Sequence, residues 1–191
     1  TFLWARIHLI YGLKASISGI FIEMNSRIDV LMIGIFLSDK IVGIYSFAAL
    51  FSEGFYQLFV VLQNFYNPII ANLVFKDNLE KLKSIITQGR KIIFPISILI
   101  GFTSIIFFKN LINLPIFDSQ LDRSLIPFII LIFGNVISSR YTPFINILTM
   151  SNLPMLNSAL IIYTLIANII LNLIFIPIFG INGAAVGTAT A

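Results

Sequence analysis

Four ionisable side chains lie inside long apolar runs of this sequence and are its strongest candidates for chemistry. Glu23, Arg27, Asp29 and Glu53 are each surrounded by mostly apolar sequence. A charged side chain at the centre of a bilayer costs at least about 2.5–3.5 kcal/mol on insertion scales, so it normally faces a bundle interior or a watery cavity. Such residues mark substrate pathways, ion pathways and proton relays. The sequence therefore predicts a polar interior in a membrane protein.

The spacing of Glu23 and Arg27 predicts an ion pair on one helix face. The two residues are four apart, with the acidic residue first, which is the favourable order in a helix. Two interpretations stay open for the pair: a purely structural contact or a contact to substrate.

Uncharged polar residues recur at helical spacing in three apolar segments. These are Ser46, Gln57, Asn64 and Asn67 around Glu53; Asn135, Ser139, Thr142, Asn146 and Thr149; and Asn157, Thr164, Asn168 and Asn172. Most of the intervals are three, four or seven residues, which stacks side chains on one helix face. The stripes are either the lining of a central passage or interhelical hydrogen bonds that contribute about 0.6–2 kcal/mol each. Arg27, Asp29 and Glu53 favour the passage, because packing does not require charge.

Composition fixes the class of protein that carries these residues. Of 191 residues, 58% are hydrophobic and 10% are charged, whereas a soluble domain has about 25% charged residues. A crossing helix needs about 20 mostly apolar residues, and the long apolar runs lack the alternation of transmembrane strands. The sequence predicts an all-α, polytopic helical membrane protein with about five complete transmembrane helices and the start of a sixth.

The expected spans follow from the apolar runs and the polar turns between them. They cover about 13–37, 41–75, 92–112, 125–149, 153–176 and, in part, 181–191. Lys76–Lys91 is predicted to be a short amphipathic helix at the membrane surface. Pro143 is expected to kink the fourth span, since a mid-helix proline removes a hydrogen bond. The first residue is not Met and the last apolar run is short, so we expect a fragment of a longer protein.

Basic residues orient the spans. Seven of them fall on one side, at Arg6, Lys14, Lys76, Lys81, Lys83, Arg90 and Lys91, and three on the other, at Lys40, Lys109 and Arg123. The positive-inside rule places the seven in the cytoplasm, where they also attract anionic membrane lipids. Basic residues scattered among spans form no continuous stripe for nucleic acid.

Several function classes lack their residues in this sequence. There is no cysteine and only one histidine, which excludes thiolate and His-based metal sites. The sequence contains no phosphate-binding loop for nucleotides and no nucleophile or metalloprotease motif. We therefore expect a protein that is not an enzyme and has no cofactor beyond a coupling H⁺ or Na⁺.

Five stretches together resemble the polysaccharide biosynthesis (Wzx-type O-antigen/capsule) flippases of the multidrug/oligosaccharidyl-lipid/polysaccharide (MOP) superfamily. They are Arg27–Gly34, Val42–Ala49, Glu53, Asn67–Ile70 and Ile176–Ala185, the last matching a P-x-x-G-I-x-G-A-A turn. The resemblance implies a MATE-like single lobe, the second half of a two-lobe transporter. It implies movement of undecaprenyl-diphosphate-linked oligosaccharide repeat units across the bacterial cytoplasmic (inner) membrane, with polysaccharide polymerase and chain-length proteins as partners.

Under this reading, roles can be assigned to individual residues. Arg27 is the candidate for the diphosphate, and Asp29 or Glu53 for the coupling ion. The sugar hydroxyls are expected to bind amides, at Gln57, Asn64, Asn146, Asn168 and Asn172. Transport would proceed by alternating access, with one lobe rocking against the other.

Three alternatives remain. A MATE-type drug/cation antiporter would use the same carboxylates. A membrane-embedded polysaccharide polymerase or ligase would need a large external loop, and the longest one here covers only about 113–124. A scaffold without transport activity would tolerate neutral substitution of its charges.

Overall fold

The part of the chain that the structure describes folds into helices. This computed structural model describes residues 4, 23–25, 27–151 and 153–191, and residues 27–36 are helical. The elements that follow are α2 (Asp39–Phe75), α3 (Leu79–Ile112), the 3-10 helix η1 (Ser119–Ser124), α4 (Leu125–Ser138), the 3-10 helix η2 (Thr142–Phe144), α5 (Ile147–Met150), α6 (Pro154–Phe179) and α7 (Ile181–Thr190). All regular elements within these described ranges are helical, which confirms the predicted all-α class.

Four described segments are long and apolar enough to cross a membrane. They are Asp39–Phe75, Leu79–Ile112, Ser119–Ser138 and Met155–Phe179. Most of their large apolar side chains are exposed, as lipid-facing residues are. The first predicted span lies outside the described residues up to residue 22, and its end at 27–36 is helical. The chain is therefore a multi-pass membrane protein.

The predicted surface helix at Lys76–Lys91 is not separate from the third span. The structure has one helix, α3, of 34 residues, which begins where the Asn78 side chain accepts a hydrogen bond from the Lys81 backbone N–H. At 1.5 Å per residue this helix is about 50 Å long, well beyond the ~30 Å hydrocarbon core. Its charged N-terminal third therefore projects from the membrane as a direct continuation of the span.

The predicted fourth span, 125–149, is broken rather than kinked. The helix α4 ends at Ser138, and a turn, η2 and α5 follow it. Side-chain hydroxyls donate hydrogen bonds to backbone carbonyls near the break. Ser139 Oγ donates to Val136 O at 2.6 Å, and Thr142 Oγ1 donates to Ser138 O at 3.0 Å. Pro143 offers no backbone N–H to continue the helix. Together these residues stabilise a complete interruption.

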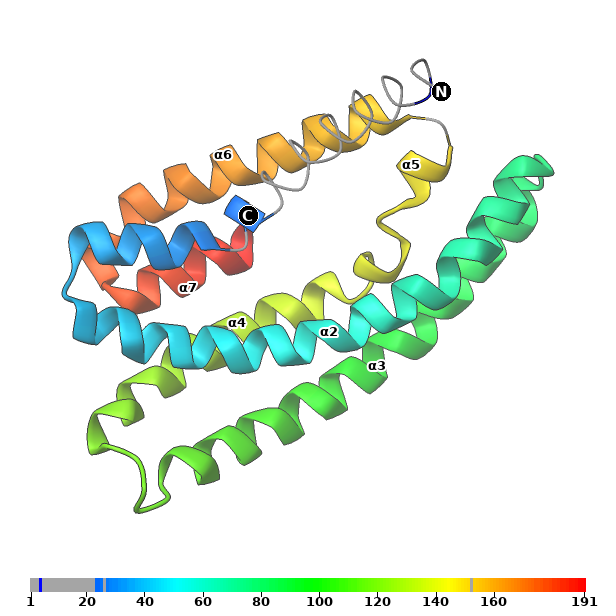
Figure 1. The fold of residues 1–191 in the computed structure, drawn as a ribbon. Coiled ribbons are helices and arrows are strands. Elements are labelled where there is room, and N and C mark those ends of the chain that lie inside the picture. The colour runs from blue at the N-terminus through cyan, green and yellow to red at the C-terminus, as the bar shows by residue number, and fades with distance from the viewer. Residues whose placement is uncertain (1–3, 5–22, 26, 152) are drawn as a thin grey trace.

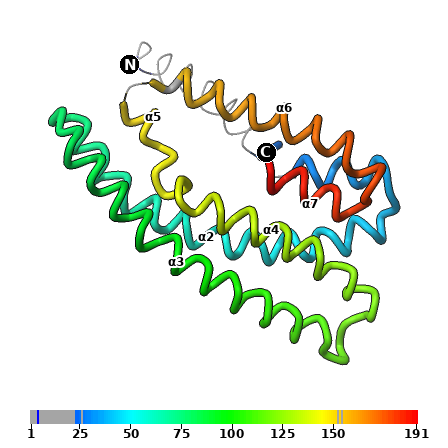
Figure 2. The backbone as a smooth tube through the Cα atoms, turned by 180° about the vertical axis from the view of Figure 1, so that it is seen from behind, coloured from blue at the N-terminus to red at the C-terminus, as the bar shows by residue number. Residues whose placement is uncertain are grey.

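The helices form two hairpins joined through α4. The long helices α2 and α3 make the first hairpin, and α6 and α7 make the second (Figure 1). The helix α4 contacts α2, α3 and α7, and the view from behind shows it between the two hairpins (Figure 2). Residues 27–36 add Met32 and Ile33 to an apolar cluster with Ile44, Ile176 and Ala184. This cluster fixes the start of the described chain against both hairpins.

Part of the polar stripe at residues 135–149 links helices. The amide Nδ2 of Asn135 on α4 donates to Ser52 Oγ on α2 at 2.9 Å. The hydroxyls of Ser97 on α3 and Ser139, just after α4, are 2.9 Å apart. These contacts confirm interhelical hydrogen bonding as one role of this stripe.

Asn135→Ala should lower the free energy of unfolding by about 1 kcal/mol, the usual contribution of an interhelical hydrogen bond in a membrane protein. Thermal or denaturant unfolding of the purified full-length protein in detergent measures the change. Asn110→Ala is the matched control, because Asn110 is exposed and the structure shows no side-chain hydrogen bond from it to a described residue. Equal effects of the two substitutions would contradict the assignment.

Candidate functional site

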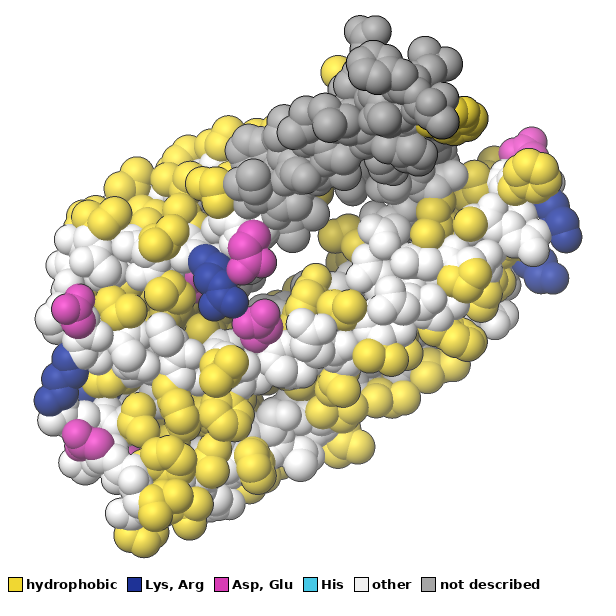
Figure 3. Space-filling view, viewed as in Figure 1, with side chains coloured by type: hydrophobic (Ala, Val, Ile, Leu, Met, Phe, Trp, Pro, Cys, Tyr) yellow, Lys and Arg dark blue, Asp and Glu magenta, His cyan; other side chains and the backbone are white. Residues whose placement is uncertain are grey.

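A cavity of about 450 Å³ with both polar and apolar walls lies where residues 27–36 meet α2, α4 and α7. Its polar lining residues are Arg27, Asp29, Ser46, Ser52, Glu53, Tyr56, Gln57, Asn135 and Thr188. Acidic and basic side chains gather at the middle of this face of the molecule (Figure 3). The cavity therefore brings together Arg27, Asp29, Glu53 and Gln57, four of the residues predicted for the site.

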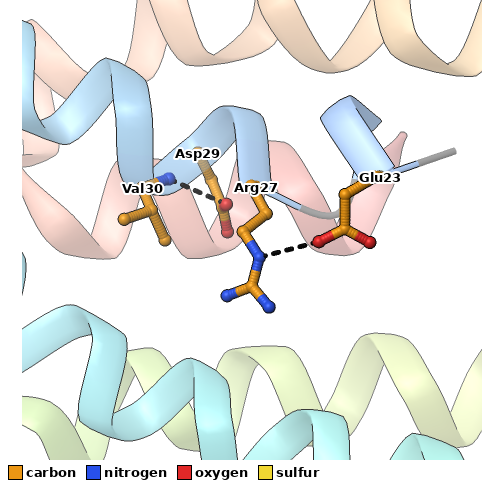
Figure 4. A network of polar contacts seen from close by, with 4 residues as sticks. All are labelled: Glu23, Arg27, Asp29 and Val30. Carbon is orange, nitrogen blue, oxygen red and sulfur yellow. Dashed lines mark hydrogen bonds and ion pairs between the residues drawn. The ribbon is translucent and has the colours of Figure 1, made fainter. Parts of the chain in front are cut away.

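The predicted ion pair is present at the mouth of the cavity. Arg27 Nε donates to Glu23 Oε1 at 3.0 Å, and both side chains are exposed. Figure 4 shows the rest of the guanidinium pointing away from the helix of residues 27–36. An exposed pair of this kind is screened by solvent and contributes little to stability. Arg27 can therefore exchange Glu23 for another anion at little cost.

Asp29 is the buried carboxylate of the site. Only 4% of its surface is exposed. Its oxygens accept hydrogen bonds from the Tyr45 hydroxyl, from Thr188 Oγ1 at 3.3 Å and from the Val30 N–H at 2.8 Å. Three donors replace the water that a buried carboxylate loses. No Lys or Arg forms an ion pair with Asp29 among the described residues, so its partners are neutral.

Glu53 and Gln57 form the α2 wall of the cavity. They are one helical turn apart and both are exposed. The lining therefore carries two carboxylates, those of Asp29 and Glu53, and one guanidinium, that of Arg27. The charge balance of this cavity is therefore acidic.

The ligands that the lining offers are oxygen atoms. The described residues contain no group of three His, Cys, Asp or Glu side chains arranged to hold a metal ion. Asp29 with the hydroxyls of Tyr45 and Thr188 supplies oxygen, the ligand type that hard cations prefer. Oxygen ligands of this kind suit hard cations better than soft transition metals.

The other predicted amides lie outside this cavity. Asn64 is exposed on α2, and Asn146 Nδ2 donates to Asn67 Oδ1 at 3.4 Å. Asn168 and Asn172 are buried on α6, where Asn172 Nδ2 donates to Asn168 Oδ1 at 2.9 Å. Asn172 packs against Gly187 so closely that a Cβ there would lie 2.6 Å from its Oδ1. In this structure the two buried amides therefore belong to the contact between α6 and α7.

Two residues next to Asp29 were not predicted as part of the site. Tyr45 is fully buried, and its hydroxyl donates a hydrogen bond to Asp29. Thr188 comes from the last helix, 159 positions away from Asp29. Asp29 and Tyr45 lie on different helical segments, separated by the break at residues 37–38, so neither contact has a local sequence signal.

Two proteins of known or inferred role are similar to the chain. The probable low-salt glycan biosynthesis flippase Agl15 of Haloferax volcanii is 30% identical over 188 residues, covering 94% of this chain and 37% of that protein. The probable flippase AglR of the same organism is 27% identical over 190 residues, covering 97% of this chain and 38% of that protein. No protein-family model matches the chain, and no solved structure matches it.

The chain thus spans between a third and two fifths of the length of these relatives. The similarity covers nearly all of the chain. The chain is thus a multi-pass helical protein with a cavity between its helices, and it is similar to part of two probable flippases, one of which is named for glycan biosynthesis.

Proposed function

We propose that the chain is one lobe of a flippase that moves lipid-linked oligosaccharide repeat units across the cytoplasmic membrane. The observation that supports this most is the acidic and amide-lined cavity among apolar helices. A sugar needs hydrogen-bond partners while it crosses the bilayer, and the lining supplies hydroxyl, carboxylate and amide groups. The lipid tail remains in the bilayer, beside the exposed apolar faces of the helices.

In this proposal Arg27 binds the diphosphate of an undecaprenyl-diphosphate-linked glycan destined for O-antigen or capsule. A guanidinium binds phosphate oxygens with two parallel N–H donors. The exposed contact with Glu23 is weak enough to be replaced. Diphosphate binding thus releases Glu23, which links arrival of the substrate to a change at the mouth of the cavity.

Asp29 is the proposed coupling site for H⁺ or Na⁺, with Glu53 as the exposed carboxylate nearer the mouth. Asp29 has neutral hydrogen-bond partners from α2 and α7. Binding of a cation there changes the charge of a contact that joins three helical segments. Such a contact can bias the rocking motion of alternating access. The helix break at residues 139–146, rather than a bend at Pro143, is the flexible point that this motion would use.

The amides outside the cavity keep a proposed role in sugar binding. Asn64 lies further along α2, and Asn146 lies after the helix break. Asn168 and Asn172 are buried here, so their contact with sugar requires a state in which α6 separates from α7. Polysaccharide polymerase and chain-length proteins are the partners that this role implies.

Arg27→Ala and Glu53→Gln should each abolish surface polysaccharide in a complementation assay of the full-length protein. Arg27→Ala removes the diphosphate ligand, and Glu53→Gln removes a carboxylate from the mouth of the cavity. Lys109→Ala is the control, because Lys109 is an exposed cation in the last turn of α3 and does not line the cavity. Membrane fractions should contain all three variants equally. Normal polysaccharide from both cavity variants would reject the proposed roles.

The acidic balance of the cavity favours one second candidate, a drug/cation antiporter of the MATE type. Two carboxylates and aromatic Tyr56 in the lining suit an organic cation. Uptake of a cationic dye into vesicles that contain the full-length protein, dependent on Glu53, would support the antiporter. Accumulation of untranslocated lipid-linked glycan in the same variant would support the flippase.

A further inference from the structure

Arg90 and Arg140 form a second basic site, away from the cavity. Arg90 lies on α3 and Arg140 lies in the turn after α4. Arg90 Nε donates to the backbone oxygen of Arg140 at 3.0 Å. The Arg90 guanidinium lies over the Tyr141 ring at 4.7 Å, and that of Arg140 lies over the Phe94 ring at 3.6 Å. Each guanidinium is thus held against an aromatic face.

This stacking leaves the guanidinium edges for a ligand. A guanidinium that covers a ring keeps its N–H donors in the plane of the group, where they point outward. Both arginines are exposed. The described residues provide neither of them with an Asp or Glu partner within ion-pair distance. Two fixed cations without an acidic neighbour in the described chain are suited to an anion from outside it.

The helix break creates the site. Without the turn at residues 139–141, Arg140 would continue along α4 instead of reaching α3. Arg90 and Phe94 are one helical turn apart on α3, so the two cations lie at neighbouring levels along that helix. Figure 2 shows the end of α4 running beside α2 and α3 on the face opposite to that of Figure 1.

The surroundings are those of a membrane interface. Ile92 and Ile96 on α3 and Ile137 on α4 are exposed, and at about 100° per residue Ile92 and Ile96 lie on the face of α3 opposite to Arg90. Exposed Lys91 is adjacent to Arg90, and Lys81 and Lys83 lie further toward the start of the same helix. The positive-inside rule assigns this end to the cytoplasm. The arginines therefore lie at the level where the basic start of α3 passes into its apolar, membrane-spanning part.

We propose that Arg90 and Arg140 bind the phosphate of an anionic membrane lipid in the cytoplasmic leaflet. The phosphodiester accepts hydrogen bonds from the two guanidinium edges, and the acyl chains extend from this level into the bilayer. Basic pockets between transmembrane helices on the cytoplasmic side are suited to such headgroups. The bound lipid joins α3 to the break after α4, so it stabilises the point at which this lobe is interrupted.

Native mass spectrometry of the full-length protein with added phosphatidylglycerol tests the proposal. Each cation near an anionic phosphate contributes about a fivefold gain in binding, so Arg90→Gln with Arg140→Gln should weaken retention of one lipid about thirtyfold. The matched control is Lys109→Gln with Arg123→Gln, which removes two exposed cations from the opposite, outward side and should leave retention unchanged. Equal retention by the two double variants would overturn the proposal.

Two further measurements keep the test decisive. If the double Gln variant does not fold, Arg90→Lys with Arg140→Lys keeps the charge but removes the planar fork, and it should still weaken retention about fivefold. Wild-type retention by this Lys pair would overturn the proposal. An excess of inorganic phosphate should leave the lipid bound, because the acyl chains also contribute. Release of the lipid by inorganic phosphate would assign the site to a soluble anion instead.

Discussion

Asp29→Asn should reduce glycan export by the full-length protein about ten- to a hundredfold, the loss expected when a buried charged hydrogen-bond partner becomes neutral. The amide has nearly the volume of the carboxylate, and its oxygen can still accept from Tyr45 or Thr188. It cannot carry a negative charge or bind a coupling ion. We expect lipid-linked glycan to accumulate in the membrane, which thin-layer analysis of extracted lipids measures, while surface polysaccharide falls, which staining of intact cells measures.

Asp39→Asn is the matched control for this prediction. It makes the same chemical change at an exposed residue in the first turn of α2, and export should remain normal. Comparable amounts of both variants in the membrane, with similar melting temperatures, would separate transport from folding. Normal export by Asp29→Asn would remove Asp29 from the mechanism, although the fold and the cavity would stand.

Gly183→Ala should destabilise the lobe by about 3 kcal/mol or more, because overpacking against backbone cannot be relieved by a side-chain movement. A Cβ at this position would lie 2.0 Å from the backbone oxygen of Phe175 on α6. The turn before it is also fixed, since Gly180 has φ +60°, a backbone conformation that L side chains rarely adopt. The α6–α7 hairpin should separate, with a lower melting temperature and faster proteolysis in detergent.

Gly43→Ala provides the contrast to Gly183→Ala. Nothing lies within 4 Å of a Cβ at Gly43, and alanine is favoured over glycine in a helix by about 1 kcal/mol. The same substitution should therefore be neutral or stabilising on α2. A melting temperature for Gly183→Ala equal to that of the wild type would contradict the close α6–α7 packing.

The sequence predicts the helices well where apolar runs end at strong polar turns. The end at Phe75 and the start of the last helix at Ile181 match the predicted spans. Prediction from the sequence fails where the end of a helix depends on packing against other helices. The continuity of α3 through Lys91 and the break after Ser138 are set by packing and by side-chain hydrogen bonds, and hydropathy measures neither.

The candidate site follows the same division. Arg27, Asp29, Glu53 and Gln57 could be predicted, because charged and amide residues inside apolar helices must face something polar. Tyr45 and Thr188 could not, since their contacts with Asp29 cross between helices. Helical spacing alone does not identify a lining residue. Asn168 has the spacing of one, yet its side chain is buried and hydrogen-bonded to Asn172 inside the lobe.

Access of water to the cavity is the central claim, and cysteine labelling at Gln57 tests it most directly. The chain contains no cysteine, so Gln57→Cys in a full-length protein without other cysteines gives one reactive thiol. A membrane-impermeant maleimide should label it and block export, and lipid-linked glycan should slow the labelling. Ile98→Cys, on the exposed apolar face of α3, should stay unlabelled. Failure of the reagent to reach residue 57 from either side of the membrane would contradict a transport passage through this lobe.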